Sequence, residues 1–309
     1  MGFSSRLLRP AILRIAGHQW TQHLATRSRI GRSVATRFVA GETLPDALAV
    51  ARELAQIGVT AGLNHLGENA ESPSQALESR EAYLAEVAAG QAVELDMIVS
   101  IKLTQLGLDE SVDACWANVE PIVAAAEPSG MVVMIDMESY AYVDETLDVL
   151  HRAVARSPRV GVAIQSYLRR STEDVFALPA GCRVRLVKGA YLERREVVFR
   201  SMRDVDGAYR RLFATLLERG HAIDVATHDP DLIDGVRGRV DATPDGWSRV
   251  EFQMLYGVRP DLQRSLAAQG YPVRVYIPYG TDWYPYLTRR LAERPANVWF
   301  FLSNLMRTR

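Results

Sequence analysis

The fold follows from a pattern that is clearest in residues 159–188, which read RVGVAIQSYLRRSTEDVFALPAGCRVRLVK. Two short β-rich runs, 159–165 and 182–188, flank a longer and more polar segment. A β-rich run, a helical segment and a second β-rich run are typical of a βαβ unit in a parallel sheet.

The same unit recurs along most of the chain. Beyond about residue 56, β-rich runs follow one another at separations of about 23 to 39 residues. No Gly-x-Gly-x-x-Gly turn follows the first run, which disfavours a doubly wound nucleotide-binding sheet. Eight strand–helix units in roughly 250 residues predict an α/β fold, a (β/α)8 TIM-like barrel. The runs are 58–64, 95–103, 131–137, 159–165, 182–188, 222–228, 250–255 and 273–279.

The sequence also marks helix ends. Ser72 is the predicted N-cap of a helix in which Pro73 takes the first position and Gln75 the third. We expect this helix to end at Gly90, because glycine commonly follows the last turn of a helix.

Composition excludes several classes of protein. A chain of 309 residues with 48% hydrophobic content can bury a large core, and its net charge of -1 argues against a nucleic-acid partner. Cys115 and Cys182 offer no disulfide framework, which suits a reducing, cytoplasmic compartment. The histidines form no pair at metal-ligand spacing, so we expect no metal site. No apolar run approaches the roughly 20 residues that span a bilayer.

The amino-terminal segment has a different character. Seven arginines and no acidic residue precede Glu42. We therefore predict a basic helical arm over residues 1–45, followed by the barrel domain over 46–309. Such an arm suits a transit-like segment, peripheral binding to an anionic membrane, here the inner face of the cell membrane, or a pair of helices packed against the barrel.

Lysine is rare in this chain, which contains 34 arginines and only two lysines, Lys102 and Lys188. Both follow predicted strands, and the active sites of such barrels lie at the carboxyl ends of the strands. We therefore expect both ammonium groups to act in the site. The other residues at strand ends are Asn64, His65, Glu68, Gln105, Asp136, Glu138, Gln165, Arg185, Thr227, His228, Gln253, Leu255 and Tyr276.

The last predicted helix carries Tyr286, Arg289, Arg290 and Glu293 on one face. Adjacent arginines beside a tyrosine can bind a carboxylate through charge-assisted hydrogen bonds. The alternative is a solvated face with an ordinary pair between Arg290 and Glu293.

Seven motifs resemble, in order and spacing, those of the FAD-dependent proline dehydrogenases, specifically the single-function bacterial enzymes. The resemblance implies a distorted (β/α)8 barrel whose last helix lies over the barrel mouth, and no second catalytic domain. The motifs are SIKLTQLGL (100–108), IDME (135–138), RLVKGAY (185–191), ATHD (226–229), EFQMLYG (251–257), VRVYIPYG (273–280) and YLTRRLAERP (286–295).

The resemblance also implies a reaction: oxidation of L-proline to Δ1-pyrroline-5-carboxylate by hydride transfer from C5 to FAD N5. This is the first step of proline catabolism, with electrons passed to a quinone of the respiratory chain. The implied catalytic residues are Lys102, Asp136 and Arg185. The implied substrate-binding residues are Lys102, Leu255, Tyr276, Tyr286, Arg289 and Arg290. The implied FAD-binding residues are Gln165, Arg185, Lys188, Gly189, Tyr191, Thr227, His228 and Glu293.

Some alternatives remain open at the level of the sequence. A class I aldolase-type barrel would use Lys188 or Lys102 as a Schiff-base lysine. A barrel acting as a membrane-bound scaffold would need no cofactor. The proton of the proline amine could leave to water or to Lys102, and His65 is expected to pack at the rim and not to catalyse.

Overall fold

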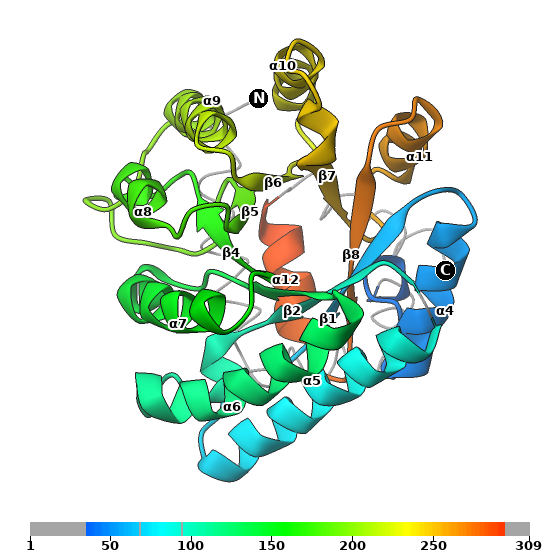
Figure 1. The fold of residues 1–309 in the computed structure, drawn as a ribbon, viewed down its shortest axis with the longest axis vertical. Helices are drawn as coiled ribbons and strands as arrows, with labels where there is room; N and C mark the ends of the chain where they lie inside the picture. Colours follow the sequence, from blue (N-terminus) through cyan, green and yellow to red (C-terminus); the bar gives the residue numbers. More distant parts are fainter. Residues whose placement is uncertain (1–34, 68, 94, 294–309) are drawn as a thin grey trace, which may run out of the picture.

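Eight parallel strands form a closed barrel in sequence order in this computed structural model, which describes residues 35–67, 69–93 and 95–293. β8 pairs with β1 and closes the cylinder (Figure 1), so the predicted fold is confirmed. The strands are β1 (Thr60–His65), β2 (Met97–Ile101), β3 (Val132–Ile135), β4 (Val160–Gln165), β5 (Arg183–Val187), β6 (Ala222–Ala226), β7 (Val250–Leu255) and β8 (Val273–Tyr279).

Helices surround the barrel wall, and the last one lies across the barrel end, as Figure 1 shows. They are α4 (Leu44–Ala55), α5 (Pro73–Val93), α6 (Val112–Ala126), α7 (Val143–Arg156), α8 (Ser171–Ala177), α9 (Met202–Glu218), α10 (Pro230–Asp241), α11 (Pro260–Ala268) and α12 (Trp283–Glu293). Short 3-10 helices occur at η1 (Leu103–Leu106), η2 (Glu127–Ser129), η3 (Tyr140–Tyr142) and η4 (Gly246–Ser248).

Helix α5 begins where the sequence predicts but ends later. Its start is confirmed, because the Gln75 N–H donates to Ser72 Oγ at 3.4 Å. Its predicted end at Gly90 is wrong, because the helix continues to Val93. A Cβ at Gly90 would overlap the terminal methyl groups of Met97 and Met131. This glycine therefore allows close packing of the helix against the barrel instead of ending the helix.

Side chains alternate between the two faces of each strand. On β5, Val184 and Leu186 are fully buried in the hydrophobic core between barrel and helices. The Tyr209 hydroxyl of α9 donates to the Leu186 carbonyl at 2.9 Å and ties that helix to the strand. Burial of each such aliphatic side chain contributes about 1.5–3 kcal/mol, and this layer holds the strand ends in place.

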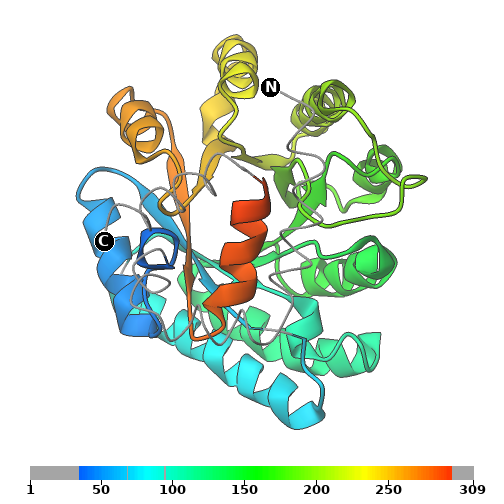
Figure 2. The same ribbon diagram turned by 180° about the vertical axis from the view of Figure 1, so that it is seen from behind.

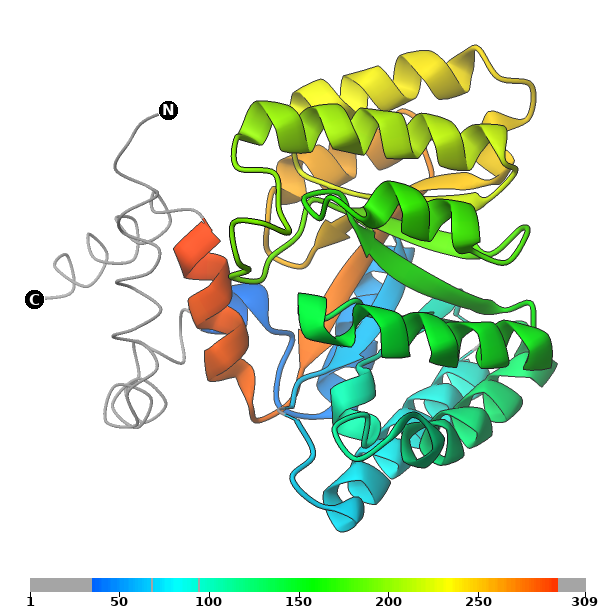
Figure 3. The same ribbon diagram turned by 90° about the vertical axis from the view of Figure 1, so that its left-hand side faces the viewer.

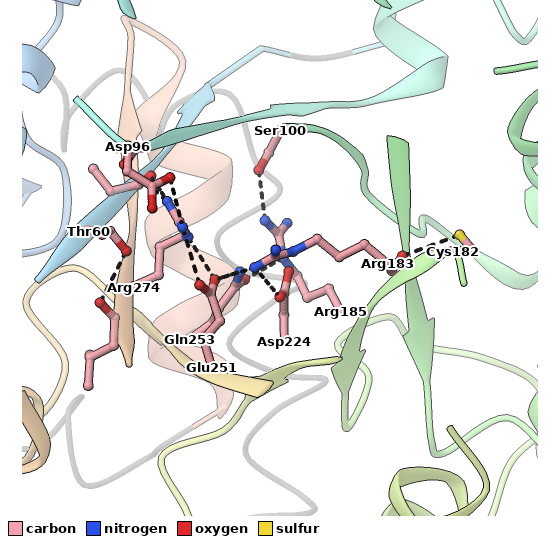
Figure 4. A network of polar contacts seen from close by, with 12 residues as sticks. Thr60, Asp96, Ser100, Cys182, Arg183, Arg185, Asp224, Glu251, Gln253 and Arg274 are labelled. Atoms are coloured by element: carbon pink, nitrogen blue, oxygen red, sulfur yellow. Dashed lines mark hydrogen bonds and ion pairs between the residues drawn. The ribbon is translucent and has the colours of Figure 1, made fainter. Parts of the chain in front are cut away.

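The opposite faces of the strands carry polar side chains that lie inside the barrel (Figure 4). Arg183 and Arg185 lie two residues apart on β5, so they point to the same side about 6.6 Å apart along the strand. The same spacing separates Glu251 from Gln253. We call the lower set the barrel floor: Asp96, Arg183, Asp224, Glu251 and Arg274. We call the upper set the barrel mouth: Ser100, Lys102, Asp136, Arg185, Gln253 and Tyr276.

Helix α12 lies across the end of the barrel and not beside its wall. Figure 2 shows the helix over the ring of strands, and Figure 3 shows it beyond their ends. The helix is attached through Trp283, Tyr286 and Leu287, which pack in one hydrophobic cluster with Phe38 and Leu66. The expected cover over the barrel mouth is therefore confirmed.

Candidate active site

Three of the predicted residues meet at the barrel mouth. Asp136 accepts a hydrogen bond from Arg185 Nη1 at 2.6 Å and another from the Tyr276 hydroxyl at 2.8 Å. The Cζ atom of Arg185 lies 5.2 Å from the centroid of the Tyr276 ring. Burial, together with the Asp136 carboxylate, raises the pKa of Tyr276 well above its ordinary value, so the hydroxyl remains a donor. A cation, a carboxylate and an aromatic ring are thus fixed against one another.

Lys102 reaches the mouth from the end of β2. Its Nζ donates to Asn64 Oδ1 at 2.9 Å and to the His65 carbonyl at 3.4 Å. Its backbone N–H donates to the Tyr83 hydroxyl at 3.2 Å. Asn64 is a residue of this site that the motifs miss, although its place at the end of the first β-rich run marks it. The contact to Asn64 holds the ammonium group at the rim.

His65 lies in the wall of the mouth. Its ring centroid is 5.3 Å from that of Tyr279 and 6.3 Å from that of Tyr83. Burial lowers the pKa of His65, and the nearby charge of Lys102 lowers it further. The imidazole therefore packs between aromatic rings, as expected of a rim residue.

Arg185 has two further partners to which the resemblance assigns no role. Its Nε donates to Gln253 Oε1 at 2.7 Å, and its Nη2 donates to Ser100 Oγ at 3.0 Å. Gln253 is among the residues expected at strand ends, and Ser100 begins the SIKLTQLGL motif. With only 4% of its surface exposed, Arg185 is held from three sides inside the barrel.

Gln165 is buried beside the same opening. Its Nε2 donates to the Glu138 carbonyl at 2.8 Å. The Glu138 carboxylate accepts the Thr104 N–H at 3.0 Å and its hydroxyl at 2.7 Å. Burial raises the pKa of Glu138 although the Thr104 hydrogen bonds oppose it. Glu138 therefore fastens β3 to η1, and within the described residues the carbonyl oxygen of the Gln165 side chain is left for a ligand.

Lys188 lies between two carboxylates at the end of β5. Its Nζ is 2.6 Å from Asp206 Oδ1 and 2.6 Å from Asp229 Oδ2. Burial raises the pKa of Asp229, but the contact with Lys188 outweighs burial and lowers it. Since Asp206 lies on α9 and Asp229 caps α10, the lysine joins one strand to two helices.

The loop after Lys188 depends on a glycine. Gly189 adopts φ of +117°, and a Cβ there would overlap the ring of Tyr167. The Tyr167 N–H also donates to the Lys188 carbonyl at 2.9 Å. Tyr191, two residues further on, is half-buried. The backbone at Gly189 therefore packs closely against the Tyr167 ring and leaves no room for a side chain.

Thr227 and His228 follow β6. His228 Nε2 accepts the Leu255 N–H at 3.0 Å, which ties the end of β6 to that of β7. Thr227 Oγ1 accepts the Asp229 N–H at 3.1 Å. Leu255 is in register with Tyr276 on the neighbouring strand, so the two side chains lie side by side on the inner face.

The lid helix α12 contains the remaining predicted residues. Tyr286 is buried with 6% of its surface exposed. Arg289, Arg290 and Glu293 belong to the same helix, and their side chains lie outside the described part of the structure.

Metal-ligand clusters and membrane-spanning helices are both absent from the described residues. No group of three or more histidine, cysteine, aspartate or glutamate side chains in this part of the chain could hold a metal ion. No helix there combines the length and apolar character needed to cross a bilayer.

Curated relatives match the chain over nearly its whole length. It is 39% identical to a proline dehydrogenase of Deinococcus radiodurans, with 98% of this chain and 99% of that protein covered. It is 38% identical to proline dehydrogenase 1 of Bacillus subtilis, with 88% of this chain and 91% of that protein covered.

A solved structure supports the same relationship. The chain superposes on proline utilization A of Bdellovibrio bacteriovorus, inactivated by N-propargylglycine, with a TM-score of 0.77 and 26% identity. The match covers 84% of this chain and 32% of that longer one, so the chain spans about a third of it. The family model described as proline dehydrogenase matches residues 47–302. The chain therefore belongs to the proline dehydrogenase family.

Proposed function

We propose that this protein oxidises L-proline to Δ1-pyrroline-5-carboxylate with FAD as its cofactor, in the first step of proline catabolism. The observation that carries the proposal is the cluster of Arg185, Asp136 and Tyr276 beneath the lid helix, in a chain of this family. FAD, when bound, would accept a hydride from C5 of proline and pass the electrons on to a quinone.

The residues of the mouth fit an isoalloxazine ring. Arg185 makes three described hydrogen bonds with its five N–H groups, which leaves two for the ring's N5 and O4 edge. The Nε2 group of Gln165 donates to the Glu138 backbone carbonyl. The side-chain carbonyl of Gln165 can therefore accept a hydrogen bond from a ring N–H. A flavin ring carries both acceptors and a donor along its edge, and these two side chains complement it.

Substrate binding is assigned to the lid and the opposite wall. Arg289 and Arg290 would bind the proline carboxylate through charge-assisted hydrogen bonds. Leu255, Tyr276 and Tyr286 would enclose the pyrrolidine ring.

The polar side of the substrate pocket is assigned to Lys102 and Asp136. Each oxygen of Asp136 accepts one described hydrogen bond, so lone pairs remain for the proline amine. Fixing the ring from both sides holds C5 in one orientation, which is the main requirement of such a step.

The remaining cofactor contacts are assigned to the rim around β5 and β6. Gly189, Tyr191, Thr227, His228 and Glu293 would line the ribityl, phosphate and adenosine parts.

Lys188 is proposed as a phosphate partner in the same rim. Asp206 and Asp229 contact its Nζ, and the ammonium group has three N–H donors, so one donor remains for a phosphate beside these carboxylates.

The contacts of Lys188 also bear on the aldolase alternative. A Schiff-base lysine must become a neutral amine before it attacks a carbonyl. The Nζ of Lys188 is instead held by two carboxylates at 2.6 Å, which keep it away from a carbonyl substrate. Together with the family match, this favours the flavoenzyme.

The enzyme assignment is tested by turnover of L-proline with a soluble quinone analogue, following both the quinol and Δ1-pyrroline-5-carboxylate. We expect one product molecule for each quinone reduced, and no reaction with D-proline. Trapping of a carbonyl substrate on Lys102 or Lys188 by borohydride, with no proline oxidation, would instead support the aldolase.

Peripheral membrane docking through the arm of residues 1–45 is a separate part of the proposal. Seven arginines precede the first acidic residue, and each basic group near an anionic surface contributes about 1 kcal/mol. Deletion of residues 1–40 should reduce sedimentation with anionic vesicles. Unchanged sedimentation would show that the arm does not dock the enzyme.

A further inference from the structure

A chain of hydrogen bonds connects the mouth of the barrel to its floor (Figure 4). Arg185 Nε donates to Gln253 Oε1 at 2.7 Å, and Gln253 Nε2 donates to Glu251 Oε1 at 2.8 Å. The same Glu251 oxygen accepts Arg274 Nε at 2.7 Å. One neutral amide thus links the cation of the proposed active site to the ion pairs beneath it.

The donor and acceptor groups at its two ends determine the direction of this series of hydrogen bonds. A guanidinium only donates, and an ionised carboxylate only accepts. Gln253 can satisfy both neighbours only with its carbonyl toward Arg185 and its NH2 group toward Glu251. The reversed amide would set N–H against N–H and oxygen against oxygen. Glu251 therefore fixes which end of Gln253 faces the mouth.

Glu251 is itself kept in the accepting state by the floor. Burial raises the pKa of Glu251, but the charges of Arg274 and Arg183 outweigh burial and lower it. Arg183 Nη2 lies 2.9 Å from Glu251 Oε1, so two guanidinium groups face this one carboxylate. The carboxylate remains ionised at neutral pH, and the orientation of Gln253 does not depend on a titration in that range.

The bond to Nε controls the plane of the Arg185 guanidinium. Asp136 and Ser100 accept hydrogen bonds from the terminal nitrogens Nη1 and Nη2, and Gln253 accepts one from Nε. Three contacts on a planar group determine its orientation as well as its position. Without the contact at Nε, the group could rotate while keeping Asp136, and the two unused N–H groups would change direction.

We propose that Gln253 is a positioning residue for the reaction: it orients Arg185 so that the two unused N–H groups point at the bound FAD. This inference rests on the proposed function. A cation held at that edge favours the reduced cofactor, which carries more negative charge. Gln253 would therefore influence the redox potential of the FAD without touching the FAD itself.

The test is the midpoint potential of bound FAD in Gln253→Met, a variant of similar size that cannot hold the Arg185 Nε. We expect the ratio of reduced to oxidised FAD at a fixed potential to fall about tenfold, or about 30 mV for a two-electron couple. We also expect kcat to fall about tenfold, the loss of roughly one hydrogen bond, with little change in KM for proline.

Gln263→Met is the matched control. Gln263 is also a buried glutamine, but its Nε2 donates to the backbone carbonyls of Leu255 and Val258. The variant loses hydrogen bonds of similar strength, and we expect its FAD potential to remain that of the wild type. Gln253→Asn, whose amide is too short to reach Arg185, should show the same shift as Gln253→Met and decides the matter if Gln253→Met does not fold.

The outcomes separate the inference from the function on which it rests. A wild-type protein that binds no FAD, or whose FAD is not reduced by proline, would refute the proposed function. Reduction of the wild type by proline, with an unshifted potential in both Gln253 variants, would refute the positioning role alone. A lower melting temperature with an unchanged potential would assign Gln253 to stability and overturn the inference.

Discussion

The barrel floor and the barrel mouth use the same kinds of side chain in different ways. In the floor, Arg274 contacts both Glu251 and Asp96. Arg183 contacts Asp224 and Glu251. In the mouth, Arg185 has one carboxylate partner among the described residues, Asp136, and two neutral ones.

The difference shows how one barrel separates stability from chemistry. Each arginine of the floor pairs with two carboxylates of the floor. The charges of these arginines are therefore balanced within the floor itself. The arginine of the mouth keeps two N–H groups beyond its described contacts, and two of its three described partners are neutral groups that do not offset its charge. Chemistry in such barrels belongs to the carboxyl ends of the strands, and the opposite end serves stability.

The largest expected effect comes from breaking the floor. Arg274 is 4% exposed, and Arg274→Met would leave Glu251 and Asp96 without this cation. Removing one partner of a buried ion pair costs about 3–5 kcal/mol. Urea denaturation should show this loss in the free energy of unfolding. The control is Arg239→Met, which removes an exposed pair with Glu218 and should cost less than about 1 kcal/mol. Equal losses of unfolding free energy in the two variants would mean that the buried floor pairs stabilise the fold no more than an exposed ion pair.

The next effect concerns an acid behind the mouth. Glu86 on α5 is fully buried and accepts the Tyr279 hydroxyl at 2.7 Å. Burial raises the pKa of Glu86 from 4.5 to about 8. Between these values the folded state holds a proton that the unfolded state has released. The free energy of unfolding therefore falls by about 1.4 kcal/mol per pH unit as pH rises, and this contribution is constant above pH 8.

Glu86→Gln removes this titration. Denaturation of the wild type and the variant at several values between pH 5 and 8 should give a shallower fall for Glu86→Gln. Other titrating groups are common to both proteins and cancel in the difference. Parallel curves would mean that Glu86 is ionised in the folded state.

A smaller effect is expected at the lid. Arg289→Met or Arg290→Met removes a charge-assisted contact to the proline carboxylate, worth about 1.5–3 kcal/mol. KM for proline should rise about tenfold to a hundredfold, with FAD content unchanged. Steady-state kinetics on the two variants, with Arg239→Met as the control, measures this. An unchanged KM in both variants would mean that neither arginine binds the proline carboxylate.

The smallest expected effect distinguishes the two lysines. Lys188→Ala should weaken the retention of FAD by about tenfold, because one cation near a phosphate is lost. Lys102→Ala should keep FAD and raise KM for proline. Dialysis followed by the flavin-to-protein ratio measures retention. Equal retention of FAD in the wild type and Lys188→Ala would mean that Lys188 binds only Asp206 and Asp229 and does not contact a phosphate.

Much of the fold could be predicted from the sequence because strand period and spacing are local properties. The β-rich runs lie on the observed strands, and both lysines fall at strand ends. The end of α5 could not be predicted in this way. Gly90 has the signature of a helix stop, yet it serves the approach of Met97 and Met131, which come from other segments.

The site was predictable only in part. Charged and aromatic residues at strand ends, such as Arg185 and Tyr276, are marked by position and type. Gln253 is neutral, and its role depends on the ion pairs of Glu251 two residues earlier. The carboxylates around Lys188 are 18 and 41 residues away along the chain, so no motif connects them. Long-range pairing of this kind requires the closed barrel.

The most direct test of the assignment is the visible absorbance spectrum of the purified protein, recorded before and after anaerobic addition of L-proline. We expect a flavin band that bleaches with proline in the wild type and in Arg239→Met. A protein that stays colourless after addition of FAD, or a flavin band that proline leaves unchanged, would contradict the assignment.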